Sequence, residues 1–213
     1  MTSILSLERV RTVLAVGAHS DDIEIGAGGT LLRLAANPDV VIHWVVLSAA
    51  DERTAEARHS ASLYLAGRST ATVEVKAFRE RYFPYQPEIK EYFDDLGARI
   101  QPDLVLAPRT DDLHQDHRVA GELAVNTFRS QPVLHYELIK YEGDLITPNV
   151  YVPLTVDQMD RKVAFLDEAF PSQHGRYWWR PETFRGIAAV RGVESRSESG
   201  YAEGFQCRKL VVE

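Results

Sequence analysis

The stretch VLAVGAHSDD, residues 13–22, joins a short apolar run to a cluster of polar and titratable side chains. The apolar run, residues 13–17, is typical of a buried β-strand and ends in a glycine. Residues 25–36 follow with leucines at helical spacing, and Asn37-Pro38 predicts the end of that helix. The chain therefore opens with a predicted strand, a polar turn and a helix.

The same alternation continues along the chain. Further strands are predicted at residues 40–47, 72–78, 104–107 and 133–139, and further helices at 52–65, 88–100, 116–128, 157–170 and 181–190. This order indicates an α/β fold, a Rossmann-like open parallel sheet with helices on both faces. Residues 141–153 contain two prolines and a glycine, so we expect a loop there. No composition shift marks a boundary, and we expect a single domain over residues 1–213.

The charge balance excludes two classes of partner. The 213 residues carry 24 Lys and Arg against 31 Asp and Glu, a net charge of −7. An acidic chain of this kind argues against a protein that binds nucleic acid by neutralising phosphates. It argues equally against docking on an anionic membrane surface.

Cysteine and hydropathy favour a cytoplasmic protein. The one cysteine, Cys207, excludes an intrachain disulfide and a cysteine-based zinc cage. The longest apolar run, residues 40–50, is shorter than the ~20 residues of a membrane helix. Residues 1–11 mix acidic and basic side chains and lack an apolar core of signal-peptide length.

Two polar clusters follow predicted strands and lead into predicted helices. The first is His19-Ser20-Asp21-Asp22, and the second is DDLHQDH at residues 111–117. Ligands of open parallel sheets bind outside the carboxyl ends of the strands, where the strand order reverses. If the strands at 13–17 and 104–107 are neighbours, both clusters lie on one rim of the sheet.

The residue types in these clusters suit a divalent metal. Imidazole and carboxylate are ligands of zinc and related ions, and a catalytic zinc needs about three protein ligands and an open position for water. His19, Asp22 and His117 could supply such a set. A remaining carboxylate could act as general base, and a remaining histidine could stabilise an oxyanion or protonate a leaving amine.

The two clusters resemble the signatures of the LmbE-like, or PIG-L, family of zinc-dependent N-acetyl-sugar deacetylases. That family has Ala-His-Pro-Asp-Asp before a glycine-rich helix start and a later His-x-Asp-His. Here the first reads GAHSDDIEIGAGGT at residues 17–30, with Ser20 for the usual proline, and the second reads DLHQDHR at 112–118. Residues 53–56 resemble the family's Arg-x-x-Glu, and residues 172–173 and 201–205 resemble its C-terminal landmarks. The resemblance covers nearly the whole chain.

The resemblance implies a metal site and a substrate class. It implies Zn²⁺, with Fe²⁺ using similar ligands, held by His19, Asp22 and His117. The implied substrate is a small N-acyl amino sugar or glycoconjugate. A homo-oligomer is expected from the family alone.

The resemblance also implies roles for four other residues. Asp21 becomes the general base. His114 becomes the residue that stabilises the tetrahedral intermediate, and Asp116 orients it. Arg53 falls where the family has an arginine that can touch the sugar or its substituent, although a helix-surface ion pair would explain Arg53 equally well.

Two other functions use the same residue types. Two histidines and a carboxylate also describe an Fe(II)-dependent oxygenase site, but Asp21 and the α/β pattern favour hydrolysis. A non-catalytic carbohydrate-binding protein could keep the pocket, but it would have no use for Asp21 and His114. Either aspartate of the first cluster could also simply cap a helix.

Several residues keep more than one interpretation. His135 and His174 could line the pocket, although a purely structural role is favoured for each. Residues 177–179, Tyr177-Trp178-Trp179, could be a core edge, a sugar-stacking platform or a subunit contact. Glu24 could support the site or lie on an exposed helix face. The glycines at 26, 28 and 29 lack dinucleotide-loop spacing and instead predict close helix-to-strand packing.

Overall fold

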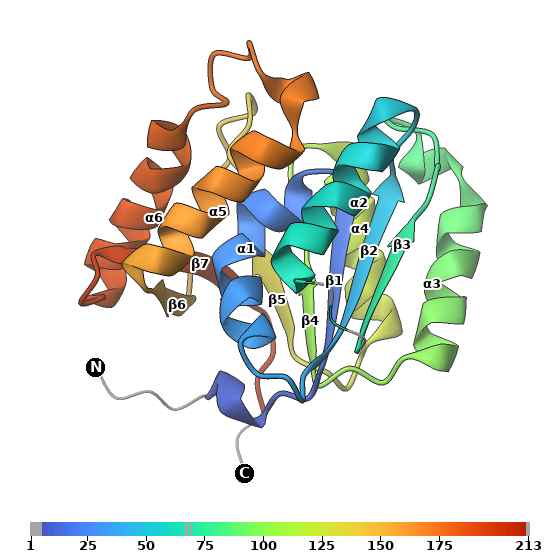
Figure 1. The fold of residues 1–213 in the computed structure, drawn as a ribbon. Helices are drawn as coiled ribbons and strands as arrows, with labels where there is room; N and C mark the ends of the chain where they lie inside the picture. Colours follow the sequence, from blue (N-terminus) through green and yellow to red (C-terminus); the bar gives the residue numbers. More distant parts are fainter. Residues whose placement is uncertain (1–5, 67, 69, 212–213) are drawn as a thin grey trace.

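The computed structural model describes residues 6–66, 68 and 70–211. Outside the described part lie residues 1–5, 67, 69, 212 and 213. The first five belong to the N-terminal segment considered above. Its centre is a seven-stranded sheet in the order β3-β2-β1-β4-β5-β7-β6 (Figure 1). Five strands run parallel: β1 (Thr12–His19), β2 (Val41–Ser48), β3 (Ala71–Val75), β4 (Leu104–Ala107) and β5 (Val133–Tyr136).

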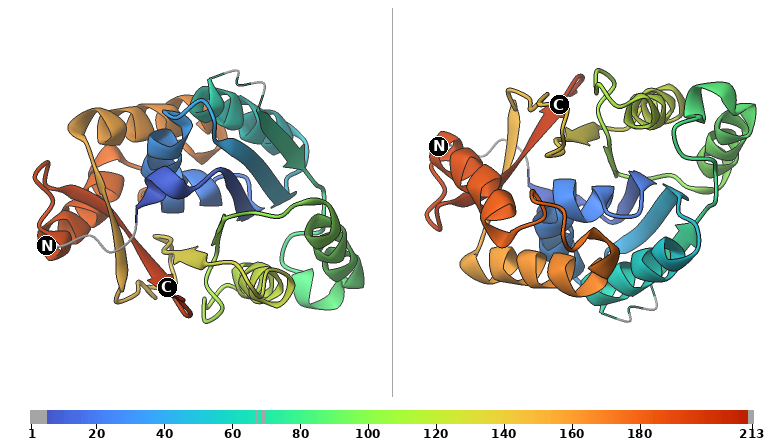
Figure 2. Two further views of the ribbon diagram at one scale, coloured as in Figure 1. Left: turned by 90° about the horizontal axis from the view of Figure 1, so that it is seen from below. Right: turned by 90° about the horizontal axis from the view of Figure 1, so that it is seen from above.

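Helices cover both faces of the sheet (Figures 1 and 2). One face packs against α1 (Asp22–Ala35), α2 (Glu52–Leu65), α5 (Val156–Ala169) and α6 (Pro181–Ser195). The other packs against α3 (Pro87–Arg99) and α4 (Gln115–Thr127). Short 3-10 turns occur at η1 (Leu7–Arg9), η2 (Phe83–Tyr85) and η3 (Pro171–Gln173). The predicted fold class is confirmed.

Strand β1 explains why the sheet is buried from both sides. Successive side chains point to opposite faces of a strand. Val13 and Ala15 therefore join the core under α1 and α2, and Leu14 and Val16 join the core under α3 and α4. All four are fully buried. Burying a side chain the size of valine or leucine contributes about 1.5–3 kcal/mol each.

The glycines of α1 let the helix approach the sheet closely. A Cβ atom at Gly26 would lie 2.2 Å from the ring of Tyr136, and one at Gly29 would lie 2.5 Å from Leu154. The Tyr136 hydroxyl donates to the carbonyl of Val16 at 2.6 Å, so the ring cannot simply move aside. Close helix-to-strand packing is the role that the structure gives these two glycines.

The C-terminal part of the sheet differs from the expectation. Residues 141–153 were expected as a loop, but their end belongs to β6 (Val150–Leu154), and β7 (Tyr201–Cys207) is a further strand. β7 runs antiparallel to both β5 and β6, so the sheet is mixed. Pro153 is tolerated because β6 is an edge strand, where a missing N–H costs no ladder hydrogen bond. The last helix also continues five residues beyond residue 190, to Ser195.

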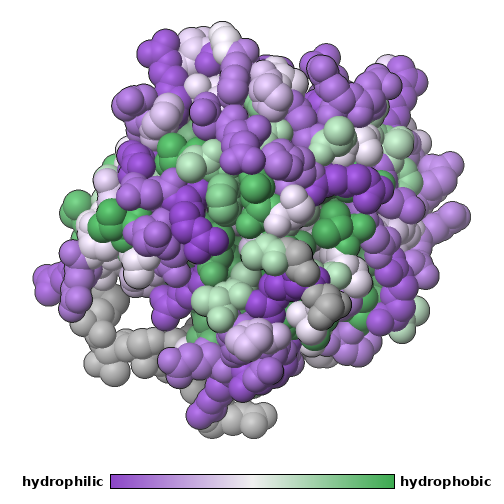
Figure 3. Space-filling view, in the orientation of Figure 1, coloured by the Kyte–Doolittle hydropathy of each residue, from purple (hydrophilic) through white to green (hydrophobic). Residues whose placement is uncertain are grey.

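The strand order reverses between β1 and β4, which are parallel neighbours. The carboxyl ends of these two strands therefore share one rim, as the placement of the two polar clusters requires. Hydrophilic side chains dominate the face drawn in Figure 3, and apolar ones show as separate patches among them. Within the described residues, no helix has the length and hydropathy to cross a membrane.

Candidate active site

Three predicted ligand side chains meet at the rim above β1 and β4. His19 Nδ1 lies 3.1 Å from His117 Nε2. Asp22 Oδ2 lies 3.5 Å from His19 Nδ1, and Asp22 Oδ1 lies 3.4 Å from His117 Nε2. Two ligands of a tetrahedral zinc, each about 2.1 Å from the ion, are about 3.4 Å apart. The spacings among these three side chains match those between ligands of one ion.

A buried carboxylate lies behind each of these histidines. Asp116 Oδ2 is 3.2 Å from His19 Nε2, and Asp112 Oδ2 is 3.3 Å from His117 Nδ1. Each carboxylate favours a proton on the ring nitrogen that it faces. The other two nitrogens, His19 Nδ1 and His117 Nε2, lie within hydrogen-bond distance of each other, at 3.1 Å. A cation placed between them could be bound by both rings in their neutral form.

The electrostatics of the cluster favour positive charge. Burial lowers the pKa of His19, but the carboxylates, with Asp22 foremost, outweigh it and raise the pKa to about 10. Burial also lowers the pKa of His117, and Asp22 and Asp112 raise it to about 9. Burial raises the pKa of Asp22, but the two histidines hold it well below its usual range. A divalent cation would meet the same stabilising field.

His114 completes a group of three histidines. Ligand atoms of His19, His114 and His117 all lie within 4.8 Å of one another, so His114 is an alternative third ligand. The distances within the set containing Asp22 are shorter. His114 stacks on His117, with ring centroids 4.5 Å apart. Its Nδ1 accepts from the backbone N–H of Asp116 at 3.3 Å, which leaves Nε2 as a hydrogen-bond donor.

Asp21 and Arg53 form an ion pair beside the cluster, with Asp21 Oδ1 3.1 Å from Arg53 Nη2. Asp21 stands at the N-cap position of α1, yet its side chain makes no capping hydrogen bond. Burial raises the pKa of Asp21 above its usual value, and the Arg53 guanidinium offsets part of that rise. Arg53 therefore favours the ionised carboxylate, the form that a general base needs.

The Asp116 carboxylate does not contact the His114 ring as expected; it lies against His19. Because α4 begins at Gln115, Asp116 lies in its first turn and points toward β1, whereas His114 is the N-cap. The N–H groups of Arg81 and Phe83 donate to Asp116 at 2.5 and 3.3 Å. Only the backbone of Asp116 contacts His114.

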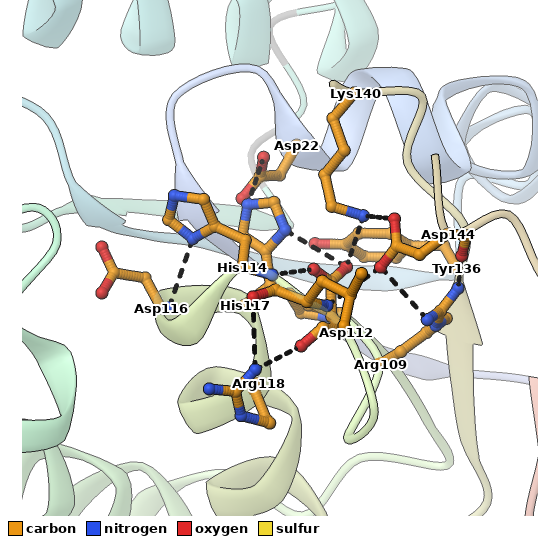
Figure 4. A network of polar contacts seen from close by, with 12 residues as sticks. Asp22, Arg109, Asp112, His114, Asp116, His117, Arg118, Tyr136, Lys140 and Asp144 are labelled. Carbon is orange, nitrogen blue, oxygen red and sulfur yellow. Dashed lines mark hydrogen bonds and ion pairs between the residues drawn. The ribbon is translucent and has the colours of Figure 1, made fainter. Parts of the chain in front are cut away.

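Sequence reasoning missed a charged network that supports the second cluster. Lys140 Nζ lies 3.3 Å from Asp112 Oδ2 and also pairs with Asp144, as Figure 4 shows. Asp144 accepts from the N–H of Leu113 at 2.9 Å, and the buried Arg109 lies 3.4 Å from it. Asp112 stood inside the quoted motif, but nothing in the sequence links it to residues 140–144.

The residues left open now have definite places. His135 is buried and bonds the carbonyl of Pro108 at 2.6 Å, and the exposed His174 pairs with Asp167. Neither of these interactions involves the cluster. Trp179 is buried in the core, whereas Tyr177 is exposed. Glu24 is fully buried, which rules out an exposed helix face, and burial raises its pKa well above the usual range.

Fold and site together define an α/β protein with histidines and carboxylates gathered at the strand-order reversal. The chain belongs to the PIG-L family, described as GlcNAc-PI de-N-acetylase, whose model matches residues 14–128. The predicted family is therefore confirmed. No curated protein sequence matches the chain.

Similar solved structures share the fold over almost the whole chain. The N,N'-diacetylchitobiose deacetylase of Pyrococcus horikoshii is 23% identical with a TM-score of 0.74, over 94% of this chain and 85% of that one. The conserved protein TT1542 of Thermus thermophilus is 21% identical with a TM-score of 0.75, over 96% and 97%. GalB, the 4-carboxy-2-hydroxymuconate hydratase of Pseudomonas putida KT2440, is 23% identical with a TM-score of 0.75, over 95% and 98%. A deacetylase and a hydratase thus share this architecture, so the reaction must be argued from the site.

Proposed function

We propose that the protein is a metal-dependent hydrolase that removes an acetyl or other small acyl group from an N-acylated amino sugar or glycoconjugate. One observation carries the proposal: donor atoms of His19, His117 and Asp22 lie 3.1–3.5 Å apart, with a separate buried carboxylate behind each histidine. Membership of the PIG-L family supports the same reaction class.

The metal proposed for the site is Zn²⁺, with Fe²⁺ as the alternative, held by His19, Asp22 and His117. When bound, such an ion polarises the acyl carbonyl and lowers the pKa of a water molecule toward ~7. Asp112 and Asp116 would hold the two histidines in the tautomers that leave their lone pairs free.

The remaining residues would carry the proton transfers. Asp21, whose ionised form is favoured by its ion pair with Arg53, takes a proton from the water that adds to the acyl carbon. The N–H on His114 Nε2 donates to the oxygen that becomes negative. The carbon–nitrogen bond then breaks, and Asp21 returns its proton to the departing amine. The products are a carboxylate and a free amino sugar.

An amine-release assay tests the proposal. The protein, loaded with Zn²⁺ or Fe²⁺, is incubated with a panel of N-acetylated sugars, and primary amine is detected with a fluorogenic reagent. Release should stop with chelator and return on addition of metal. Asp21→Asn is the matched control, because it removes the base and leaves the proposed ligands. Metal-loaded protein that releases no amine from any of the sugars would contradict the proposal.

A parallel measurement separates the neighbouring chemistries. Loss of an unsaturated carboxylic acid, followed by its ultraviolet absorbance, would indicate a hydratase. Metal-dependent oxygen consumption would indicate an oxygenase, and tight glycan binding without amine release would indicate a binding protein.

A further inference from the structure

Two loops place aromatic side chains against each other, and each loop has a support that leads back to the candidate active site. Tyr141 lies on the chain between β5 and β6, and Tyr177 and Trp178 lie between η3 and α6; we call these three residues the aromatic rim. The ring centroid of Tyr141 is 5.8 Å from that of Tyr177 and 6.4 Å from that of Trp178. Tyr141 and Tyr177 are 62% and 67% exposed. Large aromatic surface left open to solvent at one place is typical of a binding site.

The Tyr141 loop is anchored to the second polar cluster. Lys140 lies 3.3 Å from Asp112, the carboxylate that faces His117. Asp144 accepts from the N–H of Leu113, directly before His114, at 2.9 Å. Tyr141 therefore stands between two residues that are bonded to the loop carrying His114 and His117.

The Tyr177 loop is anchored on the Asp21 side of the site. Glu56 of α2 accepts from the backbone N–H and the hydroxyl of Ser172 at 2.8 and 2.7 Å. Glu56 lies about one turn after Arg53, the partner of Asp21. The segment that joins α5 to α6 rises above the sheet at the end where the site lies (Figure 1). The aromatic rim thus spans two loops whose supports reach the two sides of one site.

The charges around the rim decide which ligand chemistry it suits. Lys140, the cation next to Tyr141, is already paired with Asp112 and Asp144. It has no free charge to offer a phosphate or carboxylate. The rim itself exposes flat aromatic faces with hydroxyl groups at their edges, which suit a ring with an apolar face and polar substituents. Arg176, directly before Tyr177, is also exposed and adds a cation beside these faces.

We propose that the aromatic rim binds a second ring of the substrate, the sugar or aryl group to which the N-acylated amino sugar is linked. This inference rests on the proposed function and extends it, because it makes Tyr141 and Tyr177 specificity-determining residues. The reacting amide would lie at the His19–His117 cluster, and the linked ring would stack on the rim.

Tyr177→Ala and Tyr141→Ala test the inference with three substrates: N-acetylglucosamine, N,N'-diacetylchitobiose and an aryl N-acetyl-β-glucosaminide. Loss of an aromatic contact corresponds to roughly 2–10-fold in affinity. We expect kcat/KM to fall by about that factor for the two-ring substrates, mainly through KM. The rate on N-acetylglucosamine should stay within roughly twofold of wild type, because stacking energy enters only when a second ring is present. The disaccharide and the aryl glycoside separate a sugar from an aryl ring as the preferred occupant.

Three controls make the result decisive. Val193→Ala removes an apolar side chain of α6 that is more exposed than either tyrosine, and it should leave all three rates unchanged. Thermal unfolding and gel filtration of each variant check folding and assembly. Equal losses on one-ring and two-ring substrates, no loss on any, or a changed oligomeric state with equal losses would each overturn the rim as a substrate subsite.

A binding measurement separates this inference from the proposed reaction. Intrinsic fluorescence of wild-type and Tyr177→Ala protein is titrated with the same saccharides, and Trp178 lies within the rim. Suppose that no amine is released, that wild type binds the disaccharide more tightly than the monosaccharide, and that the variant loses this difference. The rim is then supported as a binding subsite, and the proposed deacetylase reaction is contradicted. If amine is released but binding and KM do not differ between the disaccharide and the monosaccharide, the deacetylase reaction is supported and the rim is contradicted as a subsite.

Discussion

Helix α1 contacts two buried charged clusters that differ in composition. In the middle of the helix, Glu203 accepts from the N–H groups of Gly29 and Thr30, each at 2.7 Å, and from the Thr30 hydroxyl at 2.6 Å. Lys162 donates to Glu203 and to the carbonyl of Ile25, each at 2.7 Å. Opposite charges balance, and the carboxylate has partners for both oxygens.

At the N-terminal end of the same helix, the cluster is built from histidines and carboxylates. His19 Nδ1 and His117 Nε2 lie 3.1 Å apart, and the carboxylate of Asp22 lies within 3.5 Å of both nitrogens. The backbone nearby is also strained. Asp51, two residues before Arg53, has a φ angle of 50°. Arg81, whose N–H donates to Asp116, has a φ angle of 66°. Strained backbone of this kind is concentrated at functional sites.

The contrast teaches that burial of charge does not by itself mark a functional site. Both clusters are buried and both join distant parts of the chain. The cluster around Glu203 needs nothing further and works as a structural clamp. The cluster around His19 gathers imidazole nitrogens and carboxylates whose field favours a cation and shifts the pKa of several members, and such a cluster points to function.

His117→Ala should have the largest effect, because it removes one of three proposed ligands. We expect bound metal to fall from about one ion per chain to well below that, and amine release to fall by at least roughly 10³-fold. Metal analysis after dialysis measures the first and the amine assay the second. Lys162→Met should keep its metal. Unchanged stoichiometry in His117→Ala would mean that His19, Asp22 and His114 are the ligands instead.

Asp21→Asn should lower turnover by roughly 10²–10⁴-fold while metal content stays at the wild-type level. The amide keeps the shape of the carboxylate but cannot take a proton. Steady-state kinetics and metal analysis on the same preparation give both values. A near-normal rate would remove Asp21 from its role as general base.

Lys162→Met should damage stability instead of chemistry. Removing one partner of a buried ion pair leaves Glu203 uncompensated, which costs roughly 3–5 kcal/mol of unfolding free energy. Urea unfolding measures this loss. Lys162→Met combined with Glu203→Gln should recover part of it, since the stranded charge is gone. If Lys162→Met stayed as stable as wild type but lost its metal, the cluster around Glu203 would not be purely structural, and the distinction between the two clusters would be wrong.

Asp112→Asn should weaken metal binding about 10–100-fold without abolishing it, because the carboxylate acts on His117 from behind. Competition with a chelator of known affinity measures the change. Asp144→Asn, one step further away, is the matched control and should have a smaller effect. Equal affinities for wild type and Asp112→Asn would show that Asp112 does not tune the ligand.

Arg53→Met should alter the pH dependence of turnover. Arg53 lowers the pKa of Asp21, so its removal raises that pKa, and Asp21 then stays protonated to higher pH. The acidic limb of the kcat profile should therefore move toward higher pH, and activity should recover as the pH rises. An acidic limb that does not move would mean that Arg53 acts on the substrate and not on Asp21.

Asp51→Gly should give the smallest effect. Glycine adopts positive φ without steric cost, so we expect a gain of about 1 kcal/mol in unfolding free energy. Chemical denaturation measures the gain, and kinetics show whether the strain serves Arg53. A lower unfolding free energy for Asp51→Gly would mean that the Asp51 side chain stabilises the fold by more than its backbone strain costs.

Much of the site could be predicted because its residues are adjacent in the chain. His19, Asp21 and Asp22 lie in one turn, and His114 and His117 lie in another, so each local motif is complete in the sequence. The meeting of the two motifs followed from the rule that parallel strands put their carboxyl ends at one rim. β1 and β4 are neighbours, as that rule needed.

The partners of these motifs could not be predicted, since they come from distant segments. Lys140 and Asp144 reach Asp112 because the chain after β5 turns back over the rim. The Asp116 carboxylate turns to His19 because α4 begins at Gln115 and sets the direction of its first turn. β7 enters antiparallel between β5 and β6, an arrangement that strand-helix alternation does not reveal.

The sequence by itself determined the α/β class, the family and the side chains able to bind a metal, because strand and helix periodicity and motif chemistry are local properties. The tertiary structure alone decided which carboxylate faces which histidine, which buried charges pair with each other, and which aromatic side chains form the rim. Those outcomes depend on distances of a few ångströms between segments far apart in the chain, and packing sets such distances.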